Sequence, residues 1–216
     1  MNELDGPRWG PREGAARELV VLVHGLGADG HDLIDLAPYW GKTLPHAAFA
    51  APDGPEPCDM GPTGRQWFSL SERTSAKMLA GVAAAAEALG RFVDAELARL
   101  GLAPDAYALM GFSQGAMTVL HLGLRRAVPP RAVLAFSGRL IDPEVPAGPY
   151  PPVLLVHGHV DSVVPVSGSL QDAAALETAG VEVQTLYPPL LDHGIDDAGL
   201  SAGALFLQRA FSRIES

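Results

Sequence analysis

The sequence contains a single cysteine and no long apolar run. Cys58 cannot form a disulfide within the chain, which is typical of a reducing compartment and favours a cytoplasmic location. No unbroken apolar run is longer than five residues, so neither a transmembrane helix nor stable membrane insertion is expected. Residues 1–7 have neither a basic start nor an apolar core, and no secretory signal is expected there.

Positive charge is also scarce. The chain has 25 Asp and Glu but only 15 Lys and Arg, which gives a net charge of −10. An acidic surface repels the phosphates of nucleic acids and of anionic lipids. No nucleic-acid partner is therefore expected. The expected partner is a small molecule, and the sequence leaves a homodimer open.

The overall composition indicates a globular protein. With 48% apolar and 19% charged residues, wholesale disorder is excluded. A chain of 216 residues buries enough surface to fold without a disulfide or a metal. The 24 glycines and 19 prolines have no regular spacing and indicate loops rather than a fibre. We expect an irregular lead-in over residues 1–17 and one domain over residues 18–216.

Short apolar runs alternate with helix-length stretches from Glu18 onward. The runs that predict strands are 19–23, 47–51, 106–110, 132–136, 153–156 and 181–186. The stretches that predict helices are about 31–41, 75–100, 114–127, 167–179 and 199–214. Ser75 can cap the start of the second helix, and Gly101 lies just past its end.

The composition of the runs predicts how they are arranged. Most are apolar at every position, which is typical of strands covered on both faces, whereas 181–186 alternates like an edge strand. The alternation of strands and helices predicts an α/β fold with a mostly parallel central sheet and helices on both faces. Ligands bind beyond the carboxyl ends of the strands in such sheets, so the chemistry is expected there.

A predicted nucleophile lies in the sequence GFSQG at 111–115, between an expected strand and an expected helix. A serine in such a tight turn adopts a strained backbone that exposes its hydroxyl above the sheet. The two glycines avoid collisions with the neighbouring strand and helix, and the helix N-terminus favours developing negative charge. A G-x-S-x-G match alone is only moderately specific; its place between strand and helix makes Ser113 the predicted nucleophile.

The serine hydroxyl needs a base, and the expected chain order in this fold is Ser, then Asp or Glu, then His. His193 lies in the loop between the last strand and the terminal helix, so we expect it at the carboxyl edge of the sheet as the base. His121 lies within the helix that follows the serine and points away from it. His157 and His159 precede the best acid candidate, which is the wrong order.

Asp161 is the predicted acid that orients this base. It follows the expected strand 153–156 by a short loop, at the same edge of the sheet. Asp192 is adjacent to His193 in the sequence and would have difficulty reaching the far side of its ring. The remaining acidic competitors are Asp142, which follows the preceding strand and is the fallback, Asp196 and Asp197.

The loop HGLGADG at 24–30 directly follows the first expected strand. Attack on an ester carbonyl creates an oxyanion that needs fixed backbone donors. The N–H of Gln114, directly after the nucleophile, is one expected donor, and that of Leu26 is the other. A phosphate loop is the alternative, but the loop lacks G-x-G-x-x-G and a following Lys-Ser or Lys-Thr pair. His24 lacks a recognised metal-ligand spacing to its neighbours, so we expect it to bond to the backbone.

Taken together, these motifs resemble the phospholipase/carboxylesterase branch of the α/β-hydrolases, which includes the acyl-protein thioesterases. The resemblance covers about residues 18–210 and includes HGLGADG at 24–30, GFSQG at 111–115, HGHVDSVVP at 157–165 and DHG at 192–194. It implies an α/β-hydrolase fold, a Ser113–Asp161–His193 triad and an oxyanion hole of Leu26 and Gln114. The branch commonly has Asp where this chain has Ser69, and a second Gly where it has Ala116.

The stretch 58–70 is the expected substrate wall. The resemblance places Trp67 and Phe68 beside the substrate cleft, and Met60 and Leu70 would extend the wall if this stretch folds over the site. Packing of these side chains in the core is the alternative, and the sequence leaves both open. Cys58 has no histidine and acid placed to activate it, so no catalytic role is expected for it.

These residues predict a serine carboxylic ester hydrolase of the carboxylesterase, lysophospholipase or thioesterase type. It would act through an acyl-enzyme on esters with an apolar acyl chain, with no cofactor and no metal. A metal-dependent hydrolase is one alternative, because 157–161 reads H-x-H-x-D, although Ser162 stands where a further histidine would be needed. A non-catalytic shell that binds a small ligand is the other.

Overall fold

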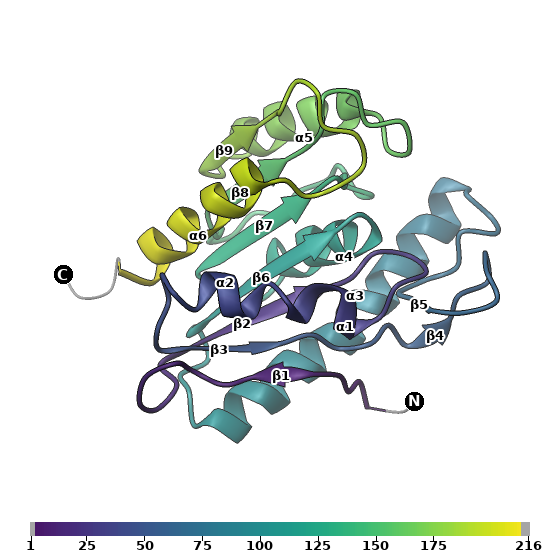
Figure 1. Cartoon of the computed structure of the whole chain (residues 1–216). Coiled ribbons are helices and arrows are strands. Elements are labelled where there is room, and N and C mark those ends of the chain that lie inside the picture. The colour runs from purple at the N-terminus through teal and green to yellow at the C-terminus, as the bar shows by residue number, and fades with distance from the viewer. Residues whose placement is uncertain (1–2, 213–216) are drawn as a thin grey trace.

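The computed structural model describes residues 3–212. Over this part of the chain, the main sheet contains seven strands: β1 (Arg8–Trp9), β2 (Glu18–Val23), β3 (Ala47–Ala50), β6 (Tyr107–Phe112), β7 (Ala132–Phe136), β8 (Val153–Val156) and β9 (Val183–Leu186). Their order across the sheet is β1-β3-β2-β6-β7-β8-β9 (Figure 1). β1 pairs antiparallel with β3, and the other neighbours are parallel. The expected mostly parallel sheet is confirmed.

Helices cover both faces of this sheet, as predicted (Figure 1). One layer consists of α3 (Ser75–Leu100), α4 (Gln114–Gly123) and α5 (Val166–Thr178), and the other of α1 (Gly30–Ile34), α2 (Ala37–Trp40) and α6 (Asp197–Ser212). A separate hairpin, β4 (Glu56–Pro57) and β5 (Arg65–Gln66), lies between β3 and α3 in the chain. The structure therefore has the α/β-hydrolase arrangement that the sequence predicts.

The apolar runs have no alternation because each strand is covered twice. In β2, Val21 packs in the core under α3 and α4, whereas Val20 and Leu22 pack in the core under α2 and α6. All three side chains are fully buried. Burial of such a side chain contributes about 1.5–3 kcal/mol, so both helical layers are held to the sheet by the same strand.

The expected helix at 31–41 is two short helices, α1 and α2. Pro38 lies in the first turn of α2, where a proline is tolerated because its missing N–H would have no partner there. Within one continuous helix it would remove a hydrogen bond and collide with the preceding turn. Proline therefore divides the segment.

Helix α3 matches the expected range but has a different cap. The hydroxyl of Thr74, not Ser75, accepts a hydrogen bond from the N–H of Lys77 at 3.3 Å. At the other end Gly101 adopts φ 67°, the left-handed conformation that glycine supplies at helix ends.

Helix α4 ends at Gly123 instead of residue 127. The N–H of Arg125 bonds to the carbonyl of Leu122, a tighter turn than the α-helix makes, and two prolines follow at 129 and 130. In α6, residues 213 and 214 of the expected helix lie outside the described residues.

The expected irregular lead-in contributes the edge strand β1. Arg8 and Trp9 pair with Ala50 and Phe49, and the N–H of Ala51 bonds to the carbonyl of Pro7. Two residues are too few to show an alternating pattern, so the sequence carried no strand signal there.

The carboxyl ends of β2, β6, β7 and β8 lie at one edge of the sheet because these strands are parallel neighbours. The loops after β2, β6 and β8 contain predicted site residues, and the loop after β7 lies beside them. In the described part of the chain, no helix is both long enough and apolar enough to cross a membrane.

Candidate active site

Ser113 occupies the turn between β6 and α4 with a strained backbone. Its φ of 54° and ψ of −116° lie in a region that side-chain-bearing residues rarely adopt. The N–H of Ser113 donates to the carbonyl of Phe136 at 2.9 Å, so neighbouring β7 helps to hold the turn. The predicted sharp strand-to-helix turn is present.

The two glycines of GFSQG are needed for the close packing of this turn. A Cβ on Gly111 would lie 2.4 Å from the backbone carbon of Gly115, and a Cβ on Gly115 would lie 1.9 Å from the carbonyl oxygen of Val23. Real side chains do not approach backbone atoms this closely. The collisions involve the helix in the first case and strand β2 in the second, as the sequence predicts.

Ser113, His193 and Asp161 form a continuous hydrogen-bonded chain. Nε2 of His193 lies 3.0 Å from Oγ of Ser113, and Nδ1 of His193 lies 2.8 Å from Oδ2 of Asp161. These are ordinary hydrogen-bond lengths. The structure thus brings together three residues that are 32 and 80 positions apart in the sequence.

Asp161 is buried and held by more than the imidazole. Its Oδ1 accepts hydrogen bonds from the N–H groups of Val163 at 2.9 Å and Val164 at 2.8 Å. Burial alone would raise the pKa of Asp161, but the hydrogen bonds from His193, Val164 and Val163 outweigh it, so the pKa lies below its ordinary value. The carboxylate therefore stays ionised and can stabilise a charged imidazole.

His157, which chain order excludes as the base, lies beside Asp161. Its Nε2 donates to the carbonyl of Val164 at 2.8 Å and lies 3.2 Å from Oδ2 of Asp161. The side chain is buried, whereas His159 is exposed. Of the H-x-H-x-D segment, His157 and Asp161 therefore lie side by side while His159 faces solvent, and no group of three His, Cys, Asp or Glu suited to a metal occurs among residues 3–212.

The other acidic candidates are engaged elsewhere. Asp142 forms an ion pair with Arg125 at 2.7 Å, and Asp196 accepts a hydrogen bond from the N–H of Gly199 at 2.8 Å in the first turn of α6. His121 lies within α4, where burial, followed by the charge of Arg125, lowers its pKa to about 4. The geometry favours Asp161 and His193 over all of them.

The loop 24–30 is fixed on both sides. His24 bonds only to backbone, with Nδ1 donating to the carbonyl of Gly25 at 2.7 Å and Nε2 accepting from the N–H of Gly54 at 2.9 Å. The N–H of Gly27 bonds to the carbonyl of Arg65, and the N–H of Arg65 bonds to the carbonyl of Ala28. The expected backbone role of His24 therefore matches its contacts.

Leu26 and Gln114 both line the cavity that contains Ser113. Gln114 is the first residue of α4, where a backbone N–H has no partner within the helix. The N–H of Leu26 donates to no acceptor within residues 3–212. The side-chain amide of Gln114 accepts from the N–H of Trp67 at 2.9 Å and donates to the carbonyl of Phe68 at 2.7 Å, which fixes the residue.

The cavity that contains Ser113 has a volume of about 530 Å³, within the range of ligand-binding sites. Most of its lining residues are apolar, and the others include two arginines, Ser113 and His193. Its residues are Leu26, Leu70, Arg73, Ser75, Met78, Ser113, Gln114, Met117, Arg139, Ile141, Val163, Val164, Pro165 and His193.

The expected substrate residues Met60, Trp67 and Phe68 do not line this cavity. Trp67 and Phe68 are buried core residues, and the indole N–H of Trp67 donates to the carbonyl of His24 at 2.9 Å. Met60 is exposed in the β4–β5 hairpin. Of the apolar side chains expected in the wall, Leu70 is the one found there.

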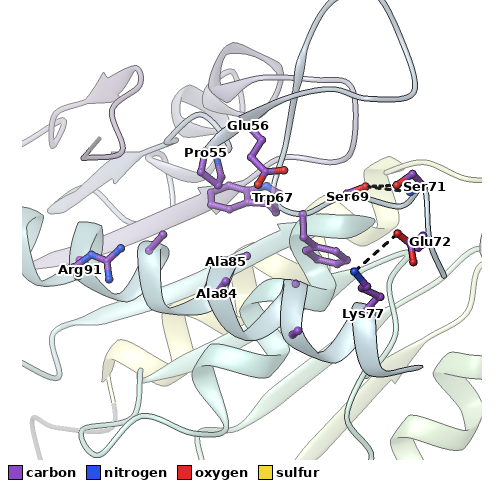
Figure 2. Close-up of a pocket in the computed structure, with 14 residues that line it drawn as sticks. Pro55, Glu56, Trp67, Ser69, Ser71, Glu72, Lys77, Ala84, Ala85 and Arg91 are labelled. Atoms are coloured by element: carbon purple, nitrogen blue, oxygen red, sulfur yellow. Dashed lines mark hydrogen bonds and ion pairs between the residues drawn. The ribbon is translucent and has the colours of Figure 1, made fainter. Parts of the chain in front are cut away.

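Trp67 and Phe68 instead border a second groove of about 540 Å³. Figure 2 shows Trp67 facing this groove with Pro55 and Glu56 on one side and Ala84 and Ala85 of α3 on the other. The segment 69–73 borders both hollows: Ser69, Ser71 and Glu72 line the groove, and Leu70 and Arg73 line the cavity that contains Ser113.

Sequence reasoning missed Arg73, Met78, Met117, Arg139 and Ile141 in the cavity wall. Met117 is one helical turn beyond Ser113, and Arg139 and Ile141 follow β7 at the catalytic edge, so spacing offered a signal for these three. Arg73 and Met78 reach the site from the start of α3, which no local pattern indicates.

Comparisons with known proteins identify the family of this chain. The sequence profile of the phospholipase/carboxylesterase family matches residues 10–210. The chain is 30% identical to esterase YpfH of Escherichia coli over 185 residues, covering 86% of this chain and 79% of that protein. It is 27% identical to acyl-protein thioesterase 1 of Gibberella zeae over 222 residues, covering 88% and 89% of the two chains.

A solved structure is similar over nearly the whole chain. The crystal structure of esterase PE8 superposes with a TM-score of 0.90 at 38% identity, covering 97% of this chain and 100% of that one. The chain belongs to the phospholipase/carboxylesterase family of α/β-hydrolases.

Proposed function

We propose that Ser113, His193 and Asp161 are the catalytic triad of this enzyme and that it cleaves esters through an acyl-enzyme. The chain is a carboxylester hydrolase of the serine type. The observation that carries the assignment of residues is the unbroken path of 2.8 and 3.0 Å hydrogen bonds from Asp161 through His193 to Oγ of Ser113.

In the first step, Oγ of Ser113 attacks the ester carbonyl carbon while Nε2 of His193 removes the hydroxyl proton. The carbonyl oxygen becomes an oxyanion, which the N–H groups of Leu26 and Gln114 stabilise. Asp161 remains ionised and stabilises the positive imidazolium through Nδ1–H. Its depressed pKa supports this role.

The tetrahedral intermediate then collapses and the bond to the alcohol oxygen breaks. His193 returns its proton to the departing alcohol, which leaves the acyl group on Ser113. A water molecule attacks this acyl-enzyme, gives its proton to His193 and releases the carboxylic acid, after which the proton returns to Ser113. The cycle uses the three side chains, the two backbone N–H groups and water.

The wall of the cavity supports an apolar acyl chain in the substrate. Leu70, Met78, Met117, Ile141 and Val163 present carbon surface beside the nucleophile. Each methylene transferred from water to such a surface contributes about 0.8 kcal/mol. An ester or thioester with an aliphatic acyl group therefore fits the site.

The single Cys58, which can form no disulfide within the chain, favours a reducing compartment, and we place the activity in the cytoplasm.

The test combines labelling with kinetics. A serine-directed fluorophosphonate should modify Ser113, and Ser113→Ala and His193→Ala should each lower kcat for a 4-nitrophenyl ester by about 10⁴- to 10⁶-fold. His159→Ala is the matched control, because this exposed histidine precedes the acid in the same loop but lies outside the cavity, and it should keep normal turnover. Hydrolysis by Ser113→Ala at the unmodified rate would refute the assignment.

A further inference from the structure

Two guanidinium groups line the cavity that contains Ser113. Arg73 precedes α3 and Arg139 follows β7, and both side chains are exposed to solvent. No Asp or Glu is among the fourteen residues that line the cavity. This is unexpected in a chain whose net charge is −10, because acidic residues outnumber basic ones over the whole sequence.

Neither arginine forms an ion pair with a carboxylate in the described part of the chain. Nε of Arg73 makes only a long bond, 3.4 Å, to the carbonyl of Leu70, and Arg139 has no hydrogen-bond partner there. Most arginines elsewhere behave differently. Those that pair with Asp or Glu are Arg8, Arg91, Arg99, Arg125, Arg126 and Arg131.

Asp172 is an acidic residue whose charge interacts with that of Arg139. The carboxylate of Asp172 is directed at the N–H of Leu140, which it binds at 2.7 Å, and it makes no ion pair with Arg139. Burial raises the pKa of Asp172 to about 6, with the Leu140 hydrogen bond and the charge of Arg139 acting in the opposite direction. The stem of Arg139 lies beside Gly168 in the first turn of α5, and the residue is exposed and forms no ion pair within residues 3–212.

Helix ends add positive potential to the same cavity. Ser75 is the first residue of α3, Gln114 is the first residue of α4, and Pro165 caps α5, and all three line the cavity. The N-terminus of a helix carries partial positive charge from its unpaired N–H groups. The two arginines and these helix ends therefore act in the same direction on any charged ligand in the cavity.

We propose that the substrate is an ester that carries an anionic group, a carboxylate or a phosphate, and that Arg73 and Arg139 bind this group while Ser113 attacks the ester carbonyl. This inference rests on the proposed function. A guanidinium recognises a carboxylate or phosphate through paired N–H donors, a fit that a neutral ester lacks. The apolar side chains that line the same cavity would hold the carbon chain that joins the anion to the ester.

The first experiment compares two acyl esters that differ by one charge. The 4-nitrophenyl ester of pentanoic acid is neutral, and the mono-4-nitrophenyl ester of glutaric acid has the same number of carbons with a terminal carboxylate. We expect kcat/KM to be higher for the glutarate ester. Arg73→Gln and Arg139→Gln should each lower the ratio of the two kcat/KM values about tenfold, because each removes a charge-assisted contact. Arg→Lys at either position should restore part of the ratio.

A second pair places the charge on the alcohol. The butyrate ester of glycerol 3-phosphate is compared with the butyrate ester of glycerol, and preference for the phosphorylated ester would locate the anion in the leaving group. Arg209→Gln is the matched control, since it removes the same charge from an exposed arginine of α6 outside the cavity, and both ratios should stay as in the unmodified enzyme. Raising the ionic strength should reduce any charge preference.

The results separate this inference from the proposed function. Hydrolysis of all four esters with equal kcat/KM for charged and neutral members would overturn the anion site and leave the esterase intact. The same conclusion follows if the arginine variants lower both members of a pair equally. Failure to cleave any of the esters, together with no phosphonate labelling of Ser113, would overturn both.

Discussion

The carboxylate of Asp192 joins the backbone N–H groups of Ser162 and His193, each at 2.8 Å from the same oxygen. Ser162 follows Asp161, the proposed acid, and His193 is the proposed base, so one exposed side chain fixes two loops that arise from different strands. Asp192 therefore positions the imidazole from its own loop, although it does not contact the ring.

Removing the hydrogen bonds that Asp192 accepts should reduce catalysis, although no reacting group is lost. We expect Asp192→Ala to lower kcat about tenfold, because small errors in the position of a catalytic group are costly. Asp192→Asn is the matched control, since its amide oxygen can still accept both hydrogen bonds, and it should remain close to normal. The readouts are kcat and the rate of phosphonate labelling at Ser113. Equal losses in the two variants would contradict a positioning role.

The elevated pKa of Asp172 predicts a specific pH dependence of stability. Its folded value of about 6 exceeds the ordinary 3.8, so the folded state binds the proton more tightly. The resulting penalty is absent below about pH 4, grows between pH 4 and 6, and is complete above pH 6. Asp172→Asn should therefore raise the free energy of unfolding by about 1 kcal/mol at pH 7, after allowance for solvent screening.

Urea denaturation at pH 4, 5, 6 and 7 checks this expectation. The gain of Asp172→Asn should shrink toward pH 4, where the wild-type carboxyl is protonated in the folded protein. Asp35→Asn, at an exposed site, controls for the loss of one negative charge. A gain that is the same at every pH would show that burial of the charge is not its cause.

Leu70 and Trp67 should respond differently to substitution. Leu70 lines the catalytic cavity, so Leu70→Ala should lower kcat/KM about five- to tenfold for an ester with a long aliphatic acyl chain and much less for an acetate ester. Trp67→Phe removes the indole donor to the carbonyl of His24. This change should cost about 1–2 kcal/mol of stability and leave KM for both esters the same. A rise in KM in Trp67→Phe would show that Trp67 contributes to the substrate wall after all.

Gly115 is expected to tolerate no side chain. In Gly115→Ala the added methyl group would overlap the carbonyl oxygen of Val23, which neither α4 nor β2 can avoid without moving. We expect a loss of about 2–3 kcal/mol in the free energy of unfolding, measured by thermal or urea denaturation. Gly10→Ala, where no atom lies within 4 Å of the added group, should change it little. Similar stability in the two variants would contradict the packing argument.

Much of the fold, and the proximity of Ser113, Asp161 and His193, could be predicted because the signals are local. The run 19–23 is buried on both faces and reads as a strand without context, and the turn around Ser113 needs glycine at two fixed positions. Chain order then limits the choice of acid and base. These features require only neighbours in sequence or the rules that govern parallel sheets.

The wall of the cavity could not be predicted in the same way. Trp67 and Phe68 were expected in the wall of the cavity. Their backbone instead hydrogen-bonds to the side chain of Gln114, and their rings are buried in the core. Arg73 reaches the cavity from a loop whose path depends on α3 packing against α4. The orientation of such side chains is a tertiary property that no local spacing contains.

The strained turn at Ser113 separates folding from chemistry. A positive φ of 54° is a conformation that glycine adopts freely and serine adopts at a cost of order 1–3 kcal/mol. A polypeptide optimised only for durability would have no hydroxyl at this point. The enzyme is therefore slightly less stable than its scaffold would allow. In exchange, the oxygen of Ser113 stays exposed toward the ester.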